Sequence, residues 1–203
     1  MTATREPVLK PVPLKELRPT QVMVGFREVA EHRRIWRQRK AKKKGAFLGT
    51  HMIPAVLGPK DHHYVIDHHH LARALIEEGV KDVFATVIAR LDRLDWLDNR
   101  GWMHPFDAEG QRCHYSDIPR AVEDMVYDPY RSLAGALRSA GGYSKETTPF
   151  SEFLWVDFLR RRIKRRLVTK EFEKALDRAL ELSKLPEADY LPGWCGPVHD
   201  MTA

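Results

Sequence analysis

Apolar and polar positions in the middle of the chain predict two neighbouring strands followed by a helix. Residues 51–57 (HMIPAVL) read as a strand, residues 58–61 (GPKD) as a turn, and residues 62–66 (HHYVI) as the returning strand. Residues 70–78 then have the apolar spacing of a helix, with Gly79 expected just past its last turn. Residues 83–91 (VFATVIARL) are rich enough in β-branched side chains for another strand. Strands alternating with a helix predict an α/β (α+β) domain.

The amino-terminal pattern predicts an extended segment, a short strand and a basic helix. Prolines interrupt residues 1–13, and residues 12–21 (VPLKELRPTQ) indicate a strand that turns at Pro19. A modest apolar stripe begins near Arg27, so we expect one helix that runs through the lysine-rich stretch and stops at Gly45.

Beyond Trp102 the pattern becomes helical. Asp128-Pro129 reads as an N-cap followed by proline in the first turn, and Thr148-Pro149 repeats this signal before a helix expected to reach about Leu167. A last helix is expected over about residues 169–184. The expected organisation is an extended segment at 1–13, an α/β domain at 14–102, a helical subdomain at 103–190 and a tail at 191–203.

Composition is typical of a globular protein, with 43% apolar and 31% charged residues in a chain of 203. No window approaches the roughly 18 apolar residues of a membrane span, and the amino terminus has no apolar signal region. The two cysteines lack the spacing of a zinc knuckle. We therefore expect a cytoplasmic protein without a membrane partner.

Positive charge is concentrated in one run. The formal net charge is +6, and the run Arg33–Lys44 holds eight Lys or Arg residues and no acid. Such a run is either a solvated helix face or a surface that contacts phosphates or nucleic acid.

Candidate chemistry gathers between Asp61 and His70, where ten residues include five histidines and two aspartates. Asp67 to His69 fall at the predicted junction of strand and helix, where unpartnered backbone N–H groups attract anions. Asp67 is a plain N-cap in one interpretation, and in a second Asp67 and His69 hold a metal with ligands from elsewhere. In a third, the junction is a phosphate-binding turn. The Asp-His-His triplet also resembles DHH phosphoesterases, but the further aspartate motif of that family does not precede Asp61.

The segment from Leu14 to Leu91 resembles the ParB/sulfiredoxin superfamily, in which a polar box between a strand and a helix lies against nucleotide phosphates. This resemblance implies a small mixed sheet with helices. The box here, Asp67-His68-His69-His70, has no cysteine, which excludes sulfiredoxin activity, and it lacks the Gly-Glu-Arg-Arg of CTP-binding partitioning proteins. It is most similar to the Asp-Gly-His-His-Arg box of ParB-like free serine kinases. His68 then replaces the glycine and Leu71 the arginine.

The kinase resemblance implies roles for individual residues. Glu28 is the first candidate for a general base and Glu31 the second, with Asp67 and His69 also in the catalytic group. The nucleotide, expected to be ATP, ADP or CTP with Mg²⁺, would be bound by His68, His70 and Arg73, helped by flanking residues. These flanking residues are Lys44, Thr50 and His51.

The helical half adds candidate substrate contacts and a second resemblance. Arg131, Ser132 and Lys145 lie at or near predicted helix starts, where they would contact substrate or simply cap helices. Residues 101–119 and 128–145 resemble the downstream part of the family called "Putative ParB-like nuclease", which extends the likeness across most of the chain.

Taken together, the sequence favours a nucleotide-dependent phosphotransferase acting on a small hydroxyl compound. Two alternatives stay open. One is a metal-dependent nuclease or phosphodiesterase, which would hold the nucleic-acid backbone through Arg33–Lys44. The other is a non-catalytic module that binds DNA or protein.

Overall fold

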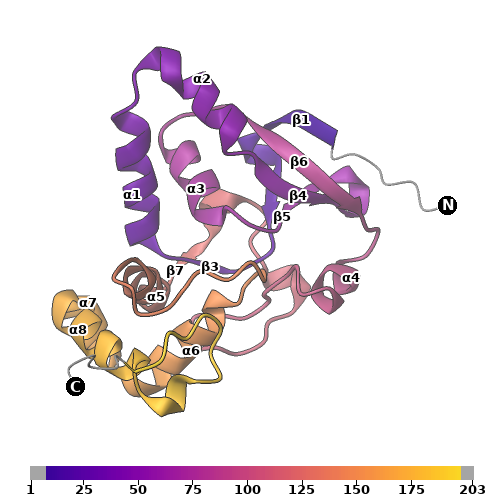
Figure 1. Ribbon diagram of the computed structural model, residues 1–203. Helices are drawn as coiled ribbons and strands as arrows, with labels where there is room; N and C mark the ends of the chain where they lie inside the picture. Colours follow the sequence, from indigo (N-terminus) through magenta and orange to yellow (C-terminus); the bar gives the residue numbers. More distant parts are fainter. Residues whose placement is uncertain (1–7, 198–203) are drawn as a thin grey trace. The chain divides into compact units, whose positions relative to one another are not determined.

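The computed structural model describes residues 8–197 and divides the chain into two compact units, residues 1–126 and 127–203 (Figure 1). This division differs from the boundary expected near residue 102. The reason is that Val122 and Met125 are buried in the same core cluster as the sheet of the first unit. The segment after Trp102 therefore completes the α/β unit before the helical one begins.

A five-stranded mixed sheet forms the centre of the first unit, in the order β1-β6-β4-β5-β2. β1 pairs antiparallel with β6, and β4 antiparallel with β5, whereas β4 and β6, and β2 and β5, are parallel. The predicted hairpin is confirmed by the pairing of β4 and β5, and the expected fold class is confirmed by the sheet and its helices. The strands are β1 (Val8–Pro13), β2 (Leu17–Pro19), β4 (Ile53–Leu57), β5 (His63–Val65) and β6 (Asp82–Arg90).

Both edge strands of this sheet contain proline. Pro11 and Pro13 stand in β1 and Pro19 ends β2. Proline has no backbone N–H, so each of them removes one donor from an edge strand.

Helices and short turns surround the sheet. They are α1 (Phe26–Arg37), α2 (Ala41–Thr50), α3 (His69–Glu77) and α4 (Leu94–Asn99), with 3-10 turns η1 (Leu14–Glu16), η2 (Pro59–Asp61), η3 (Tyr115–Asp117) and η4 (Val122–Asp124). Two further short strands are β3 (Met23–Val24) and β7 (Val126–Tyr127).

The single basic helix expected up to Gly45 is wrong, because the chain breaks at residues 38–40 and Gly45 lies inside α2. The break has a packing reason. Trp36 and Phe47 are both buried, with ring centroids 5.8 Å apart. In one straight helix these residues would stand roughly 16 Å apart along the axis. The turn between α1 and α2 lets both rings share one core.

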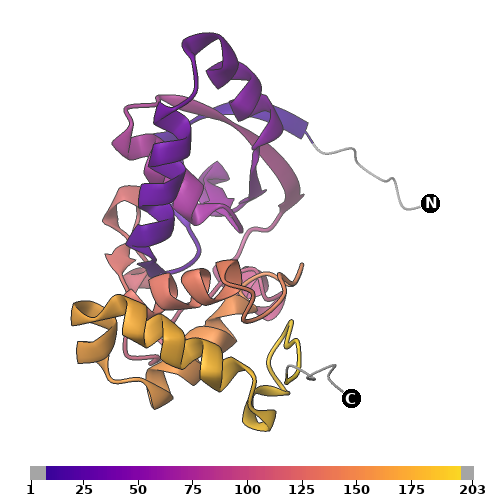
Figure 2. The same ribbon diagram turned by 60° about the vertical axis from the view of Figure 1, so that its left-hand side comes forward.

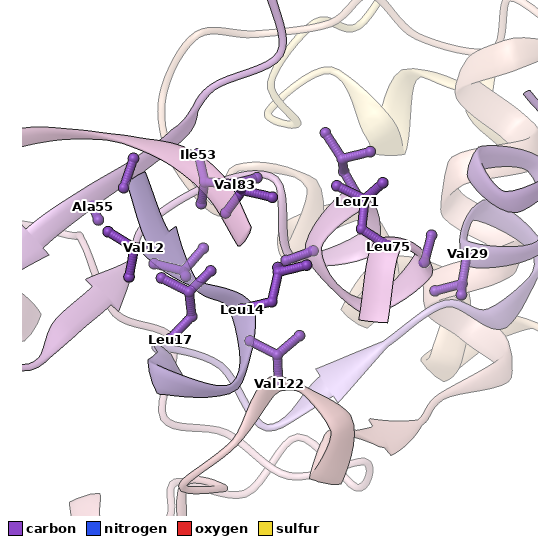
Figure 3. Close-up of a cluster of buried hydrophobic side chains, with 14 of the residues drawn as sticks. Val12, Leu14, Leu17, Val29, Ile53, Ala55, Leu71, Leu75, Val83 and Val122 are labelled. Atoms are coloured by element: carbon purple, nitrogen blue, oxygen red, sulfur yellow. The ribbon is translucent and has the colours of Figure 1, made fainter. Parts of the chain in front are cut away.

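Helix α3 lies between the sheet and α1, as Figures 1 and 2 both show. Its buried face presents Leu71 and Leu75 to the core. Figure 3 shows these two side chains beside Val29 of α1 and close to apolar side chains from the strands, η1 and η4. Gly79 follows the helix with a φ of 71°, which confirms its expected place. This packing fixes the amino end of α3, where the histidine box lies.

The second unit is helical, with α5 (Pro129–Ser139), α6 (Glu152–Arg162), α7 (Arg165–Lys170), α8 (Phe172–Ser183) and the turn η5 (Pro186–Ala188). Figure 2 shows α8 running beside α5. The N-cap at Asp128 is confirmed, since its carboxylate accepts from the backbone N–H of Tyr130 at 3.0 Å.

Two other expectations for this unit differ from the structure. The helix expected up to Leu167 breaks at Ile163, which is buried and extended and whose carbonyl accepts from the hydroxyl of Tyr130 at 2.6 Å. The segment expected as a tail begins with a buried Leu191, and the indole N–H of Trp155 donates to the carbonyl of Pro192 at 2.8 Å. Within residues 8–197, none of the helices combines the length and apolarity that a membrane crossing needs.

Candidate functional site

The box begins with a backbone turn between β5 and α3. His68 stands at the N-cap of α3 in the left-handed conformation, with φ 65° and ψ 25°. Glycine adopts this conformation without a steric cost, whereas other residues lose roughly 1–2 kcal/mol. The ring Nδ1 of His68 donates to the carbonyl of Met52 at 3.0 Å, which offsets part of that cost. A glycine at position 68 would adopt this conformation without that cost.

Asp67 is the exposed member of the box, with 63% of its side chain accessible. Its Oδ1 accepts from the backbone N–H of His68 at 2.6 Å. No described side chain caps α3, and its first turn contains no acid. The amino end of α3 thus keeps the positive partial charge that attracts an anion.

His69 points the opposite way, into the first unit, and only 3% of it is exposed. The backbone N–H of Thr20 donates to its Nε2 at 3.3 Å, and the Thr20 hydroxyl lies 3.4 Å from the same nitrogen. That hydroxyl donates to the carbonyl of Val65 at 2.5 Å. Thr20 therefore ties the end of β2 to both β5 and α3.

His70 and Glu28 meet at Gly25, the N-cap of α1. The backbone N–H of Gly25 donates to Nε2 of His70 at 3.1 Å. A Cβ at position 25 would come within 2.3 Å of Oε2 of Glu28, so the carboxylate lies directly on this glycine. The structure thereby brings Glu28, the expected base, next to a histidine of the box. Glu31, the second candidate, is exposed and bound to Arg34, and this contact holds the pKa of the Glu31 carboxyl below its usual value.

A metal site within the box has no preformed ligand set. In the part of the chain that the structure describes, no three His, Cys, Asp or Glu side chains come together where they could hold an ion. Asp67 faces solvent while His69 is turned inward to Thr20. A Mg²⁺ ion needs only one or two carboxylates when nucleotide phosphates supply further oxygens, and Asp67 fits that requirement.

Arg73, expected to bind phosphate, is engaged elsewhere. Its guanidinium donates to Glu77 at 2.7 Å and to the carbonyl of Glu123, with the carbonyls of Val122 and Met125 at 3.5 Å. It also lies over the ring of Phe26. Arg73 of α3 therefore binds the backbone of η4 and holds these two elements together.

The flanking candidates lie on or just after α2. The Thr50 hydroxyl donates to carbonyls within its own helix and lies 3.0 Å from Nδ1 of His51, whose ring stacks on Phe47. The ammonium of Lys44 lies over the ring of Trp36 at 4.8 Å. His51, which follows α2, is adjacent in sequence to Met52, whose carbonyl accepts from His68.

The basic run is partly neutralised. Arg33 and Arg37 on α1 form ion pairs with Glu77, the last residue of α3, and with Glu78 directly after it, at N–O distances of 2.7 Å. On α2 and just before it, Lys40, Lys42 and Lys43 are exposed. Exposed lysines therefore lie on and just before α2, whereas Arg33 and Arg37 of α1 bind acids at the carboxyl end of α3.

The three expected substrate contacts belong to the second unit. Arg131 and Ser132 are buried there, and the Arg131 guanidinium pairs with Glu152 at 2.8 Å. Lys145 is exposed. Burial gives Arg131 and Ser132 a part in the packing of α5.

Sequence reasoning missed Thr20 and Gly25, although they hold two of the three histidines. Each lies 45 residues or more from its partner in the chain, and neither belongs to a recognisable motif. Gly25 could have been found from one local signal, because it stands directly before a helix and three residues ahead of a glutamate.

Comparisons with known proteins identify the family. The profile of the family described as "Putative ParB-like nuclease" matches residues 10–161. A solved structure, "Crystal structure of protein Atu1540 from Agrobacterium tumefaciens", is similar with a TM-score of 0.87 and 49% identity, over 94% of this chain and 98% of that one. No curated protein matches the chain. Since the family match spans well over half of the sequence, the chain belongs to the family described as "Putative ParB-like nuclease".

Proposed function

We propose that the chain binds the phosphates of a nucleotide at the amino end of α3 and transfers one phosphoryl group to a small hydroxyl compound. The observation that carries this proposal is the contact of both Glu28 and His70 with Gly25. It joins the expected base to the box at a helix end that has no side-chain cap and no acid in its first turn.

Each residue then has a distinct role. His69 and His70 position the first turn of α3 through Thr20 and Gly25, and neither takes part in bond making. Asp67, exposed beside that turn, would hold Mg²⁺ together with the nucleotide phosphates. The ion would supply neutralisation of phosphate charge.

Glu28 acts on the acceptor substrate. Its carboxylate takes the hydroxyl proton as the substrate oxygen forms a bond to the terminal phosphorus, and the bond from that phosphorus to the bridging oxygen breaks. The nucleoside diphosphate leaves with its negative charge.

The test is calorimetric titration of the full chain with ATP, ADP and CTP in the presence of Mg²⁺, followed by a search for a phosphorylated product from small hydroxyl compounds, free serine among them. We expect binding of at least one nucleotide, its loss in Asp67→Asn, and retained binding without product in Glu28→Gln. Absence of binding by all three nucleotides contradicts the proposal at its first step.

A second candidate function is the binding or cleavage of nucleic acid. The specific observation in its favour is the group of exposed lysines on and before α2, at positions 40, 42 and 43. A phosphate backbone is recognised by such a surface without a preformed metal site.

A further inference from the structure

A pocket of about 380 Å³ lies in the first unit, between β2, η2, β5 and the segment that carries η3. None of the box residues lines it. Its volume falls within the range of sites for small molecules. Four basic or imidazole side chains and two tyrosines are among its lining residues: Arg18, Lys60, His62, Arg120, Tyr64 and Tyr115.

The lining of this pocket contains no acid. Within residues 8–197, the side chains of Lys60, His62 and Arg120 form no ion pair and no hydrogen bond. The guanidinium of Arg18 donates to the backbone carbonyl of Arg120, so this contact holds the segment with Arg120 across from β2. Positive groups without neutralising partners around one cavity attract an anion with more than one charge.

Two of the residues that line the pocket are tyrosines. The ring of Tyr64 lies so close to Gly58 that a Cβ there would come within 2.4 Å of it. Tyr115 is fixed by its hydroxyl, which donates to Asp98 at 2.7 Å. Burial raises the pKa of the Tyr64 phenol above its usual value. Two fixed rings, with prolines among the other lining residues, fit a flat organic body.

We propose that this pocket binds a phosphate monoester carried on a flat ring system, of the class of nucleoside monophosphates. The phosphate would be held by Lys60, Arg120 and Arg18, and the ring would lie against Tyr64 and Tyr115. The site shares no residue with the box. The two sites are nevertheless linked through one segment, because Arg18 and Thr20 are two positions apart and Thr20 binds His69.

The test is calorimetric titration of the full chain with AMP in the absence of Mg²⁺, with inorganic phosphate as a second probe. Lys60 and Arg120 are exposed, so Lys60→Met and Arg120→Met keep the fold. Each is expected to weaken AMP binding by roughly tenfold, the loss of one charge-assisted hydrogen bond. Lys170→Met, on the exposed surface of the second unit, is the matched control and leaves binding unchanged.

Four outcomes overturn the proposal. AMP fails to bind, or it binds equally well to Lys60→Met and Arg120→Met, or its binding is lost in Asp67→Asn, which would place it at the box. Inorganic phosphate that binds as tightly as AMP would contradict the role of the two tyrosines. Weaker phosphate binding that depends on Lys60 and Arg120 supports the site.

Discussion

Thr20 and His69 meet at a single ring nitrogen, Nε2, which accepts from the backbone N–H of Thr20 at 3.3 Å and lies 3.4 Å from its hydroxyl. Both contacts involve the same ring nitrogen, and the donor and acceptor roles depend on the tautomer of the ring. Nε2 of His69 is thus engaged with the protein itself. His69 is a positioning residue for the first turn of α3.

Substitution at His69 should therefore act on stability before it acts on chemistry. We expect His69→Ala to lower the free energy of unfolding by about 2 kcal/mol, since it leaves a cavity and an unpaired N–H. Asp67→Asn, on the exposed side of the same turn, should change it by less than about 0.5 kcal/mol while removing nucleotide binding. Urea unfolding and titration with nucleotide check the two effects. Equal free energies of unfolding for both variants would show that the contact of His69 with Thr20 does not stabilise the fold.

Gly25 should be sensitive to a single added methyl group. In Gly25→Ala the new Cβ displaces the carboxylate of Glu28, because it would stand 2.3 Å from Oε2. The end of a glutamate side chain moves easily, so we expect a stability loss of at most about 1 kcal/mol together with a large fall in phosphoryl transfer.

Gly45→Ala is the matched control for Gly25→Ala, since nothing lies within 4 Å of a Cβ there and Gly45 is inside α2. It should stabilise the protein by about 0.5–1 kcal/mol and leave transfer unchanged. If Gly25→Ala retains full transfer, Glu28 is not the base. Adding Glu28→Gln to Gly25→Ala should cause little further loss, because both changes remove the same group.

Arg73 should prove structural. Arg73→Met removes the donor to the carbonyls of η4, and we expect it to cost about 1–3 kcal/mol of stability with nucleotide affinity kept. Thermal unfolding and calorimetry separate the two quantities. A variant of normal stability that no longer binds nucleotide would restore Arg73 to the phosphate-binding group.

Asp128 makes two polar contacts inside the helical unit, a helix cap and an ion pair. It is fully buried, caps α5 and pairs with Arg160 at 2.7 Å, so Asp128→Ala should lower the free energy of unfolding by about 3 kcal/mol or more. Asp128→Asn keeps the cap and should cost less. The exposed Asp177→Ala is the control, with an expected change below about 0.5 kcal/mol. Chemical denaturation measures all three.

The lysines near α2 distinguish the second candidate function. If they bind a phosphate backbone, replacing Lys40, Lys42 and Lys43 with alanine should weaken duplex DNA binding and reduce its logarithmic salt slope by about 1 for each phosphate that a lysine neutralised. Fluorescence anisotropy at several salt concentrations gives that slope. An unchanged slope would exclude this surface, and the phosphotransferase proposal would stand without it.

Local signals predicted most of the fold. Two strand-like segments on either side of the GPKD turn located β4 and β5, the Asp128-Pro129 pair located α5, and Gly79 marked the end of α3, because each depends on neighbours in sequence. The break between α1 and α2 and the extended Ile163 were missed. Both are dictated by burial of side chains that become neighbours only in the folded chain.

In the candidate site, too, local sequence features were predictable and contacts between distant residues were not. The box was found because its residues are consecutive and stand at a predicted strand-to-helix junction. The orientation of its members was not predictable, since Thr20, Gly25 and Met52 decide it from 16 to 49 residues away. Arg131 looked available for phosphate because its partner Glu152 is distant in sequence, and Arg73 because its contacts with η4 are distant, although its ion pair with Glu77 is local.

The prolines of the edge strands have a consequence for the protein at high concentration. An exposed edge strand with a full row of N–H donors is a template on which a second molecule can extend the sheet and begin to aggregate. Pro11 and Pro13 interrupt that row in β1, and Pro19 ends β2 after three residues. Both edges of the sheet are therefore poor templates for the addition of a strand from a second molecule. We expect this property to lower the tendency of the protein to form fibrils.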